Sequence, residues 1–195
     1  MILCMKNSQH FLAPVILLFF LSFQCQAASS TLDPELRDLL KKAVNDTQSF
    51  KDRFEAEVWF TDMNQRLKRR VKDDEERLSL LNMIHEEARR VDLQPELVLA
   101  VIQIESGFDR WAISSVGARG LMQVMPFWLK EIGRPGDNLF NARTNLRMGC
   151  TILRHYLDKE KGNIIKALGR YNGSLGSFRY PGKVLKALRK NWYRP

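Results

Sequence analysis

The sequence predicts an all-α protein, in which a helical domain follows an N-terminal helical extension. Three observations support this fold class. Apolar residues recur every three or four positions in successive segments, which is the spacing of a buried helix face. No run of residues alternates between apolar and polar side chains as a half-buried strand does. Proline, glycine and asparagine separate the periodic segments, as expected for helix ends.

The composition is that of a folded protein with a strong positive charge. Hydrophobic residues make up 45% and charged residues 27% of the 195 positions, which excludes a wholly disordered chain. The formal net charge of +9 favours an anionic partner. Nucleic acid, an anionic membrane surface and an acidic polymer such as peptidoglycan all fit this charge, so charge alone does not choose among them.

Residues 1–28 have the pattern of a secretory signal peptide. Lys6 precedes an apolar run over residues 11–23, and Ala27 and Ala28 provide small side chains for cleavage. The run is shorter than the ~20 residues of a membrane-spanning helix, so we expect an exported protein with no membrane span in the mature chain. Cleavage would remove the other cysteines and leave Cys150, whose apolar helical surroundings predict a buried core residue.

Residues 29–76 form the predicted extension. Asp33 and Pro34 suit the cap and the first position of a helix, and apolar residues predict a second helix between residues 50 and 71. The basic run at residues 66–72 changes sign at residues 73–76, and we interpret it as a solvated helix or linker rather than a nucleic-acid contact. A boundary near residue 76 therefore separates the extension from a domain at residues 77–195.

The domain begins with a helix predicted over residues 78–91. His85 stands beside Glu86 and Glu87 on the side expected to be polar, and His155 is isolated in the sequence. Neither histidine has partners at the spacing of metal ligands. We therefore expect no metal site and no cofactor.

The helix predicted from Pro95 carries an acid, Glu105, at its far end. Among residues 97–104 only Gln103 is polar, so we expect this helix to be buried on most sides. Gly107 is placed to end it, because glycine readily adopts the left-handed conformation of helix ends. Burial and the negative end of the helix dipole both raise the pKa of the Glu105 carboxyl. The carboxyl would then keep its proton near neutral pH, as a general acid requires.

Further apolar segments follow this helix. Gly117 and Gly120 open a segment that closes at Pro126, in which Leu121 and Met125 are expected in the core. The remaining predictions are a short segment ending at Gly133, a long helix capped by Asn141 and ending near Gly162, a helix over residues 164–171, and a last helix after Pro181.

Four motifs follow one another in this part of the chain. They read Glu105-Ser106-Gly107-Phe108, Gly117-Ala118-Arg119-Gly120-Leu121-Met122-Gln123-Val124-Met125-Pro126, Asn145 with Gly149 and Tyr156-Leu157, and Tyr171-Asn172-Gly173. In this order and spacing, residues 78–193 resemble the catalytic domain of SLT-type soluble lytic transglycosylases. The resemblance implies a lysozyme-like helical domain, and it does not extend to residues 29–72.

The resemblance implies an enzyme of the periplasm that cleaves peptidoglycan glycan strands between N-acetylmuramic acid and N-acetylglucosamine. The reaction uses no water and leaves a 1,6-anhydromuramic end. Glu105 matches the family's single catalytic acid, which protonates the bridging oxygen and then takes a proton from the muramic 6-hydroxyl. The acetamido oxygen of the substrate stabilises the positive charge at the anomeric carbon. The second carboxylate that most glycosidases use is therefore not needed.

The same resemblance implies a set of substrate-binding residues. Tyr171 matches a tyrosine whose hydroxyl lies close to the acid, and Met122 and Gln123 match residues that line the sugar cleft. Ser114 matches a polar residue of the same wall. Asn172 either bonds the backbone near the cleft or caps a helix end.

Three further positions refine this picture. We expect Asn145 and Gly149 to be structural, as a polar tie and a close helix contact. Arg170 stands where the family usually has alanine. Its side chain either binds carboxylates of the peptidoglycan stem peptides or faces solvent, so the departure bears on subsite preference more than on the reaction.

Two alternatives to a lytic transglycosylase stay open from sequence. A hydrolytic muramidase of goose-lysozyme type would need a base to hold water, for which Asp109 is the nearby candidate. A non-catalytic peptidoglycan-binding component of a secretion apparatus would use the cleft alone, although Glu105 and Tyr171 argue against it. An envelope or secretion-machine protein is a further partner to consider, whereas the export signal argues against nucleic acid.

Overall fold

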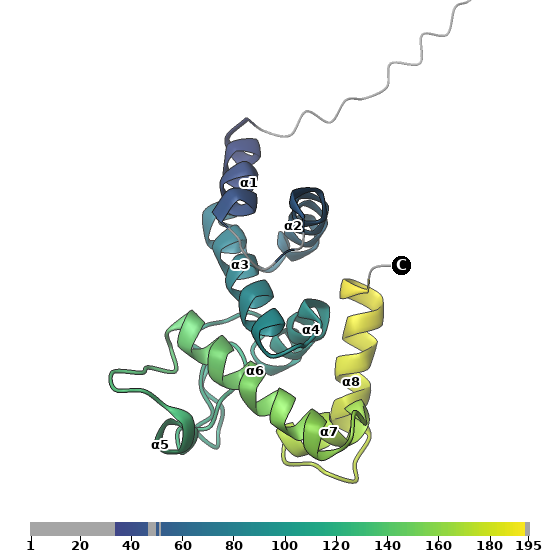
Figure 1. Cartoon of the computed structure of the whole chain (residues 1–195). Coiled ribbons are helices and arrows are strands. Elements are labelled where there is room, and N and C mark those ends of the chain that lie inside the picture. Colours follow the sequence, from purple (N-terminus) through teal and green to yellow (C-terminus); the bar gives the residue numbers. More distant parts are fainter. Residues whose placement is uncertain (1–33, 47–49, 51, 194–195) are drawn as a thin grey trace, which may run out of the picture. The chain divides into compact units, whose positions relative to one another are not determined.

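The computed structural model of this chain describes residues 34–46, 50 and 52–193 (Figure 1). The predicted signal segment 1–28 and the predicted cap Asp33 lie outside the described residues. Regular structure in the described part consists of helices, with no strand, so the predicted all-α fold class is confirmed. None of these helices is both long enough and apolar enough to cross a membrane.

The described part of the extension folds into two helices that pack on the start of the domain. These are α1 (Pro34–Asp46) and α2 (Arg53–Leu67), which contact each other and α3 (Asp74–Arg90). Asp52 begins α2 by accepting the Glu55 N–H at 2.7 Å, and Asp73 begins α3 by accepting the Glu76 N–H at 2.7 Å. Each cap satisfies an N–H group that the first helical turn leaves free. The domain boundary near residue 76 stays a prediction.

Arg77 holds the junction between α2 and α3. Its side chain has no exposed surface, yet its donors are matched. Nε donates to Asn64 Oδ1 at 2.5 Å, Nη1 donates to the Val71 carbonyl at 2.8 Å, and Nη2 forms an ion pair with Asp74. A buried cation is tolerated when its hydrogen bonds and charge are satisfied in this way. In the basic run at residues 66–72, residues 68–70 and Lys72 are exposed as predicted, whereas Arg66 is half-buried and pairs with Asp62 at 2.6 Å.

His85 is buried, so the prediction that it lies on the polar side of its helix is wrong. Its ring stacks on Phe50 with centroids 3.6 Å apart and meets the edge of Trp59 at 4.9 Å. Burial lowers the pKa of His85 to about 3, and the positive charge of Arg89 acts in the same direction. Both aromatic partners come from the extension, which the helical pattern of residues 78–91 alone does not reveal.

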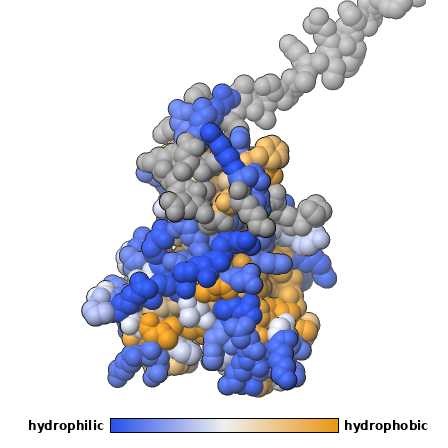
Figure 2. Space-filling model, in the orientation of Figure 1, coloured by the Kyte–Doolittle hydropathy of each residue, from blue (hydrophilic) through white to orange (hydrophobic). Residues whose placement is uncertain are grey.

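Helix α4 (Pro95–Glu105) runs through the hydrophobic core. Its residues 97–102 are buried, which confirms the expected burial of the helix on most sides. The core continues without a break from Leu40 in α1 to Trp192 near the end of the chain. On the face drawn in Figure 2, hydrophilic residues dominate, and apolar surface is confined to separate patches.

The last turn of α4 is bonded to a short turn at residues 188–192. Gln103 Oε1 accepts hydrogen bonds from Asn191 Nδ2 at 3.0 Å and from the Trp192 indole at 2.9 Å. Both donors lie in the short π-helical turn η1 (Leu188–Trp192). Gln103, the exception to the apolar pattern, therefore positions the residues that precede Glu105.

Residues 106–127 form a series of turns rather than a helix. Two isolated bridges, Ile113 with Arg119 and Arg119 with Val124, hold the turns together. Leu121 is buried as predicted, but Met125 is only half-buried, because the segment lacks the helical spacing that would place both on one face.

Four further helices follow the turns, and α8 is the one among them that packs on α4 (Figure 1). They are α5 (Trp128–Ile132), α6 (Ala142–Lys159), α7 (Ile164–Tyr171) and α8 (Arg179–Ala187). Asn141 caps α6 as predicted, accepting the Thr144 N–H at 3.0 Å, and Cys150 on α6 is fully buried as predicted. Helix α8 begins at Arg179, three residues earlier than a helix that follows Pro181 would, since the first helical turn accommodates Pro181.

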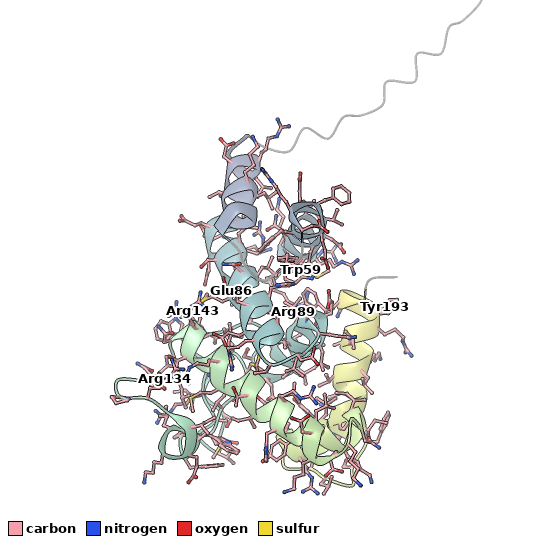
Figure 3. The ribbon with its side chains drawn as sticks, viewed as in Figure 1. Trp59, Glu86, Arg89, Arg134, Arg143 and Tyr193 are labelled. Carbon is pink, nitrogen blue, oxygen red and sulfur yellow. The ribbon has the colours of Figure 1, made fainter. Side chains whose placement is uncertain are left out.

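An ion pair joins α6 to α3. Arg143 Nη1 lies 2.8 Å from Glu86 Oε2, and the two side chains are labelled where these helices approach in Figure 3. Half-exposed pairs of this kind contribute about 1 kcal/mol or less. The packing of α6 therefore depends mainly on its buried face.

Candidate active site

Glu105 is the last residue of α4, and the chain turns away immediately after it. The Gly107 N–H donates to the Ile102 carbonyl at 3.1 Å while Gly107 itself has a φ of +62°, which confirms the predicted helix stop. Ser106 Oγ donates to the Leu121 carbonyl at 2.8 Å. These contacts hold the carboxyl at the end of a buried helix, next to the turns of residues 106–127.

Tyr180 is the side chain bonded to the acid. Its hydroxyl donates to Glu105 Oε1 at 2.5 Å. Tyr180 lies in the first turn of α8, which contacts α4, and 8% of the side chain is exposed. Because this hydroxyl occupies Oε1, the proton of the neutral acid belongs on Oε2.

The sequence analysis missed Tyr180 because it placed the start of the last helix after Pro181. With a start at Arg179, the spacing of Tyr180, Val184 and Ala187 places all three on one helix face, and all three are buried. An inward-facing tyrosine hydroxyl needs a partner. That spacing is the signal that could have identified it.

Burial raises the pKa of Glu105 to about 7, and the hydrogen bond from Tyr180 opposes this by favouring the carboxylate. The upward direction is the one expected from the sequence. The pKa of Tyr180 lies well above its ordinary value, because of burial and the nearby Glu105 charge. Tyr180 therefore remains a donor, while Glu105 can exist in either form near neutral pH.

Tyr171 lies near the acid but bonds elsewhere. Its hydroxyl donates to the Met122 carbonyl at 2.7 Å. Burial and the Glu105 charge both raise the pKa of Tyr171 well above its usual value. Tyr171 therefore ties the end of α7 to the turn that contains Met122, within electrostatic reach of Glu105.

Met122 is buried and Gln123 is half-buried, and both contribute to the packing of the turns. The Met122 side chain is fully buried, and a Cβ added at Gly149 would lie 2.5 Å from its sulfur. The expected close helix contact at Gly149 is therefore present. Gln123 Nε2 donates to the carbonyls of Gly120 at 3.0 Å and Ala112 at 3.2 Å.

Asn145 on α6 forms hydrogen bonds with these turns, which is the structural role predicted for it. Its Oδ1 accepts the Met122 N–H at 2.8 Å, and its Nδ2 donates to the carbonyls of Arg119 at 2.8 Å and Leu139 at 2.9 Å. The side chain is 1% exposed, so these bonds replace water for three backbone groups. The wall of turns beside Glu105 is thereby held rigidly.

Glu105 lines a cavity of about 320 Å³. Its lining residues are Ile104, Glu105, Asn172, Ser174, Ser177, Arg179, Tyr180 and Lys183. Of the predicted substrate-binding residues, Asn172 is the one that lines it. Ser114 is engaged in its own turn, where its Oγ accepts the Ala118 N–H at 3.0 Å.

Arg170 is half-buried and paired, and its expected binding of stem-peptide carboxylates stays a prediction. Its Nε forms an ion pair with Glu160, and the side chain is 31% exposed, so it neither faces open solvent nor reaches the cavity. The described residues contain no group of three metal-ligating side chains.

Comparison with known proteins gives a family and several relatives. The family described as "Transglycosylase SLT domain" matches residues 82–191. The chain is 37% identical over 102 residues to a transglycosylase of Enterobacteria phage PRD1, covering 49% of this chain and 37% of the relative. It is 33% identical over 113 residues to membrane-bound lytic murein transglycosylase C of Yersinia pestis (strain Pestoides F), covering 50% of this chain and 32% of the relative. The chain thus spans about a third of the length of these relatives.

Two solved structures show a distant likeness. An inactive mutant of lytic transglycosylase Slt from Pseudomonas aeruginosa has 20% identity and a TM-score of 0.45, covering 81% of this chain and 28% of that one. The 70 kDa soluble lytic transglycosylase from Escherichia coli has 19% identity and a TM-score of 0.43, covering 78% and 29%.

Proposed function

The chain belongs to the transglycosylase SLT domain family, and from this premise we propose that it is a peptidoglycan lytic transglycosylase. It cleaves the bond between N-acetylmuramic acid and N-acetylglucosamine and forms a 1,6-anhydromuramic end. The observation that carries the proposal is Glu105, a cavity-lining residue whose carboxyl has a pKa of about 7 and accepts a hydrogen bond from Tyr180. The proposal includes export to the periplasm after cleavage of residues 1–28.

Glu105 acts first as an acid. Oε2 donates its proton to the bridging oxygen while the bond from that oxygen to the muramic C1 breaks. A pKa near 7 keeps a large fraction of the acid protonated at neutral pH and makes the proton easy to give. Tyr180 donates to the carboxylate that results, so the new negative charge is stabilised where burial would otherwise disfavour it.

The same carboxylate then acts as a base. It takes the proton of the muramic 6-hydroxyl as that oxygen bonds to C1, which closes the 1,6-anhydro ring. Glu105 ends the cycle protonated, as it began, and no water is consumed. One carboxyl is enough, because the proton it gives and the proton it takes pass through the same group at different steps.

The other residues are proposed to shape the site around Glu105. Asn172 lines the cavity and is the direct contact for substrate. Tyr171 is a positioning residue, which acts through the Met122 carbonyl. Gln123 and Ser114 hold the turns that form the neighbouring wall through their bonds to backbone groups.

The proposal is tested by mass spectrometry of soluble products after the mature protein digests purified peptidoglycan. We expect products one water lighter than those of a lysozyme, and none from Glu105→Gln, which keeps the shape of the side chain but has no proton to give. Hydrated products would instead identify a muramidase, and the absence of products from the wild type would leave a peptidoglycan-binding protein.

Asp109→Asn is the matched control for the hydrolytic alternative. Asp109 is exposed, and its Oδ1 accepts the Trp111 N–H at 2.8 Å, so its carboxylate already has a structural partner. We expect this variant to keep most of the wild-type activity. Near-complete loss would favour a water-activating base.

A further inference from the structure

The cavity beside Glu105 carries positive charge that nothing in the described part of the chain neutralises. Arg179 and Lys183 both line the cavity, and they lie one turn apart on α8. Both are exposed, and neither forms an ion pair or a side-chain hydrogen bond with a described residue. Glu105 is the one acid among the lining residues, so the cavity is cationic whenever Glu105 is protonated.

Arginines on the neighbouring helices behave differently. Arg147 pairs with Asp137 at 2.5 Å, and Arg154 and Arg170 form ion pairs with Asp158 and Glu160. These side chains have charges matched within the protein. Arg179 and Lys183 differ from these arginines in two ways. They line the cavity, and neither is paired with an acidic side chain of the described residues.

The start of α8 adds to the positive electrostatic potential in the cavity. Ser177, Arg179 and Tyr180 bring the first turn of α8 to the cavity wall, and the N-cap Phe178 provides no side-chain hydrogen bond. The positive end of the helix dipole therefore faces this region, where Ser177 Oγ accepts the Arg179 N–H at 3.3 Å. Ser174, Ser177 and Asn172 supply neutral hydrogen-bonding groups around the two cations.

These charges act on an occupant of the cavity more than on the acid. Burial and the Tyr180 hydrogen bond are the causes that set the pKa of Glu105. Cations close to the carboxyl would lower that pKa and leave less of the acid protonated at neutral pH. An anion bound at Arg179 and Lys183 can therefore be held without removing the proton that cleavage needs.

We propose that Arg179 and Lys183 bind a carboxylate of the peptidoglycan stem peptide, so that the protein prefers peptide-bearing strands to bare glycan. This rests on the proposed function. The stem peptide is attached through the lactyl group of muramic acid, on the same sugar whose C1 bond is cleaved, and it carries free carboxylates. A peptide that leaves the sugar at this point brings an anion to the rim of the Glu105 cavity.

The test measures binding with catalysis removed. In a Glu105→Gln background, the affinities for a peptide-bearing glycan fragment and for the same fragment without its peptide are compared by calorimetry. Arg179→Gln with Lys183→Gln removes the two cations. Lys186→Gln with Arg189→Gln is the matched control, since it removes the same charge from exposed residues of α8 and η1 outside the cavity.

We expect the ratio of the two affinities to fall about tenfold in the cavity variant, as the loss of two partly screened ion pairs would give, and to stay at the wild-type value in the control. Raising the salt concentration should shrink the same ratio in the wild type. Equal affinities for the two fragments in the wild type, or an equal fall in both variants, would overturn the proposal.

This outcome is separable from that of the proposed function. Binding decides the carboxylate site, whereas the mass of the products formed by the wild type decides the reaction. If the protein prefers the peptide-bearing fragment but releases no anhydro products, the proposed carboxylate site is supported and the proposed lyase activity is contradicted. If it forms anhydro products but binds both fragments equally, the lyase activity is supported and the carboxylate site is contradicted.

Discussion

The Tyr180 hydroxyl lies 2.5 Å from Glu105 Oε1, and the two residues stand 75 positions apart in the chain. This bond joins the end of α4 to the start of α8 at the proposed catalytic centre. It also works against burial in setting the pKa of the acid. The pair therefore offers a way to change the acid without replacing it.

Tyr180→Phe should move the pH dependence of cleavage. Loss of the hydrogen bond removes the effect that lowers the pKa of Glu105, so that pKa should rise above about 7. The fall of kcat/KM on the alkaline side should then shift to higher pH, while the maximal rate drops about tenfold because the carboxylate formed in the reaction loses its donor. Rates measured from pH 5 to 9 check both effects, and an unchanged alkaline limb would contradict this role for Tyr180.

Folding stability should fall as Glu105 ionises. Its pKa is raised from 4.5 in the reference state to about 7 in the folded protein, so the stabilising contribution is complete below pH 4.5 and is lost as pH rises through 7. The loss amounts to about 3 kcal/mol at most. Glu105→Gln does not ionise, so its free energy of unfolding relative to the wild type should increase between pH 5 and 8. Urea unfolding at several pH values measures the difference, which should be flat if Glu105 titrates normally.

Gly149→Ala should be destabilising because of one contact. The added Cβ would lie 2.5 Å from the Met122 sulfur, and overpacking of this kind costs about 1–3 kcal/mol. Met122→Ala removes the obstructing side chain, so the two substitutions combined should cost less than the sum of their separate effects. Thermal unfolding of the four proteins of this cycle provides the coupling energy, and strict additivity would show that the helix shifts to avoid the clash.

Arg77→Met should cost about 3–5 kcal/mol in unfolding free energy, because it leaves the buried Asn64 side chain and the Val71 carbonyl without their donor. Arg70→Met serves as the control, since Arg70 is exposed and its contact is a ring 5.6 Å away in Trp192. Urea unfolding of both variants compares them. Similar stabilities would mean that water replaces the Arg77 donors.

The parts of this protein that sequence could predict are those determined by neighbours along the chain. The Gly107 stop, the Asn141 cap and the burial of residues 97–102 all follow from local patterns, and the structure confirms them. Cys150 was likewise expected in the core because of its apolar helical surroundings.

The errors concern residues whose environment comes from distant segments. His85 is buried by aromatic rings of the extension, Arg170 is neutralised by Glu160, and Tyr180 finds its partner in another helix. The local sequence does not specify the partners in these contacts, although the spacing of Tyr180, Val184 and Ala187 does indicate that Tyr180 faces inward. Long side chains with polar ends are the residues for which a helical pattern alone predicts the wrong surroundings.

The bonds of Gln103 have a consequence for the order in which the protein assembles. Gln103 precedes the acid by two positions and is held by Trp192, 89 residues later. During synthesis, α4 can form soon after it leaves the ribosome, but Glu105 has neither its tyrosine nor its support until the chain through Trp192 has emerged. The proposed catalytic centre therefore stays incomplete on the nascent chain until residues 180–192 have emerged.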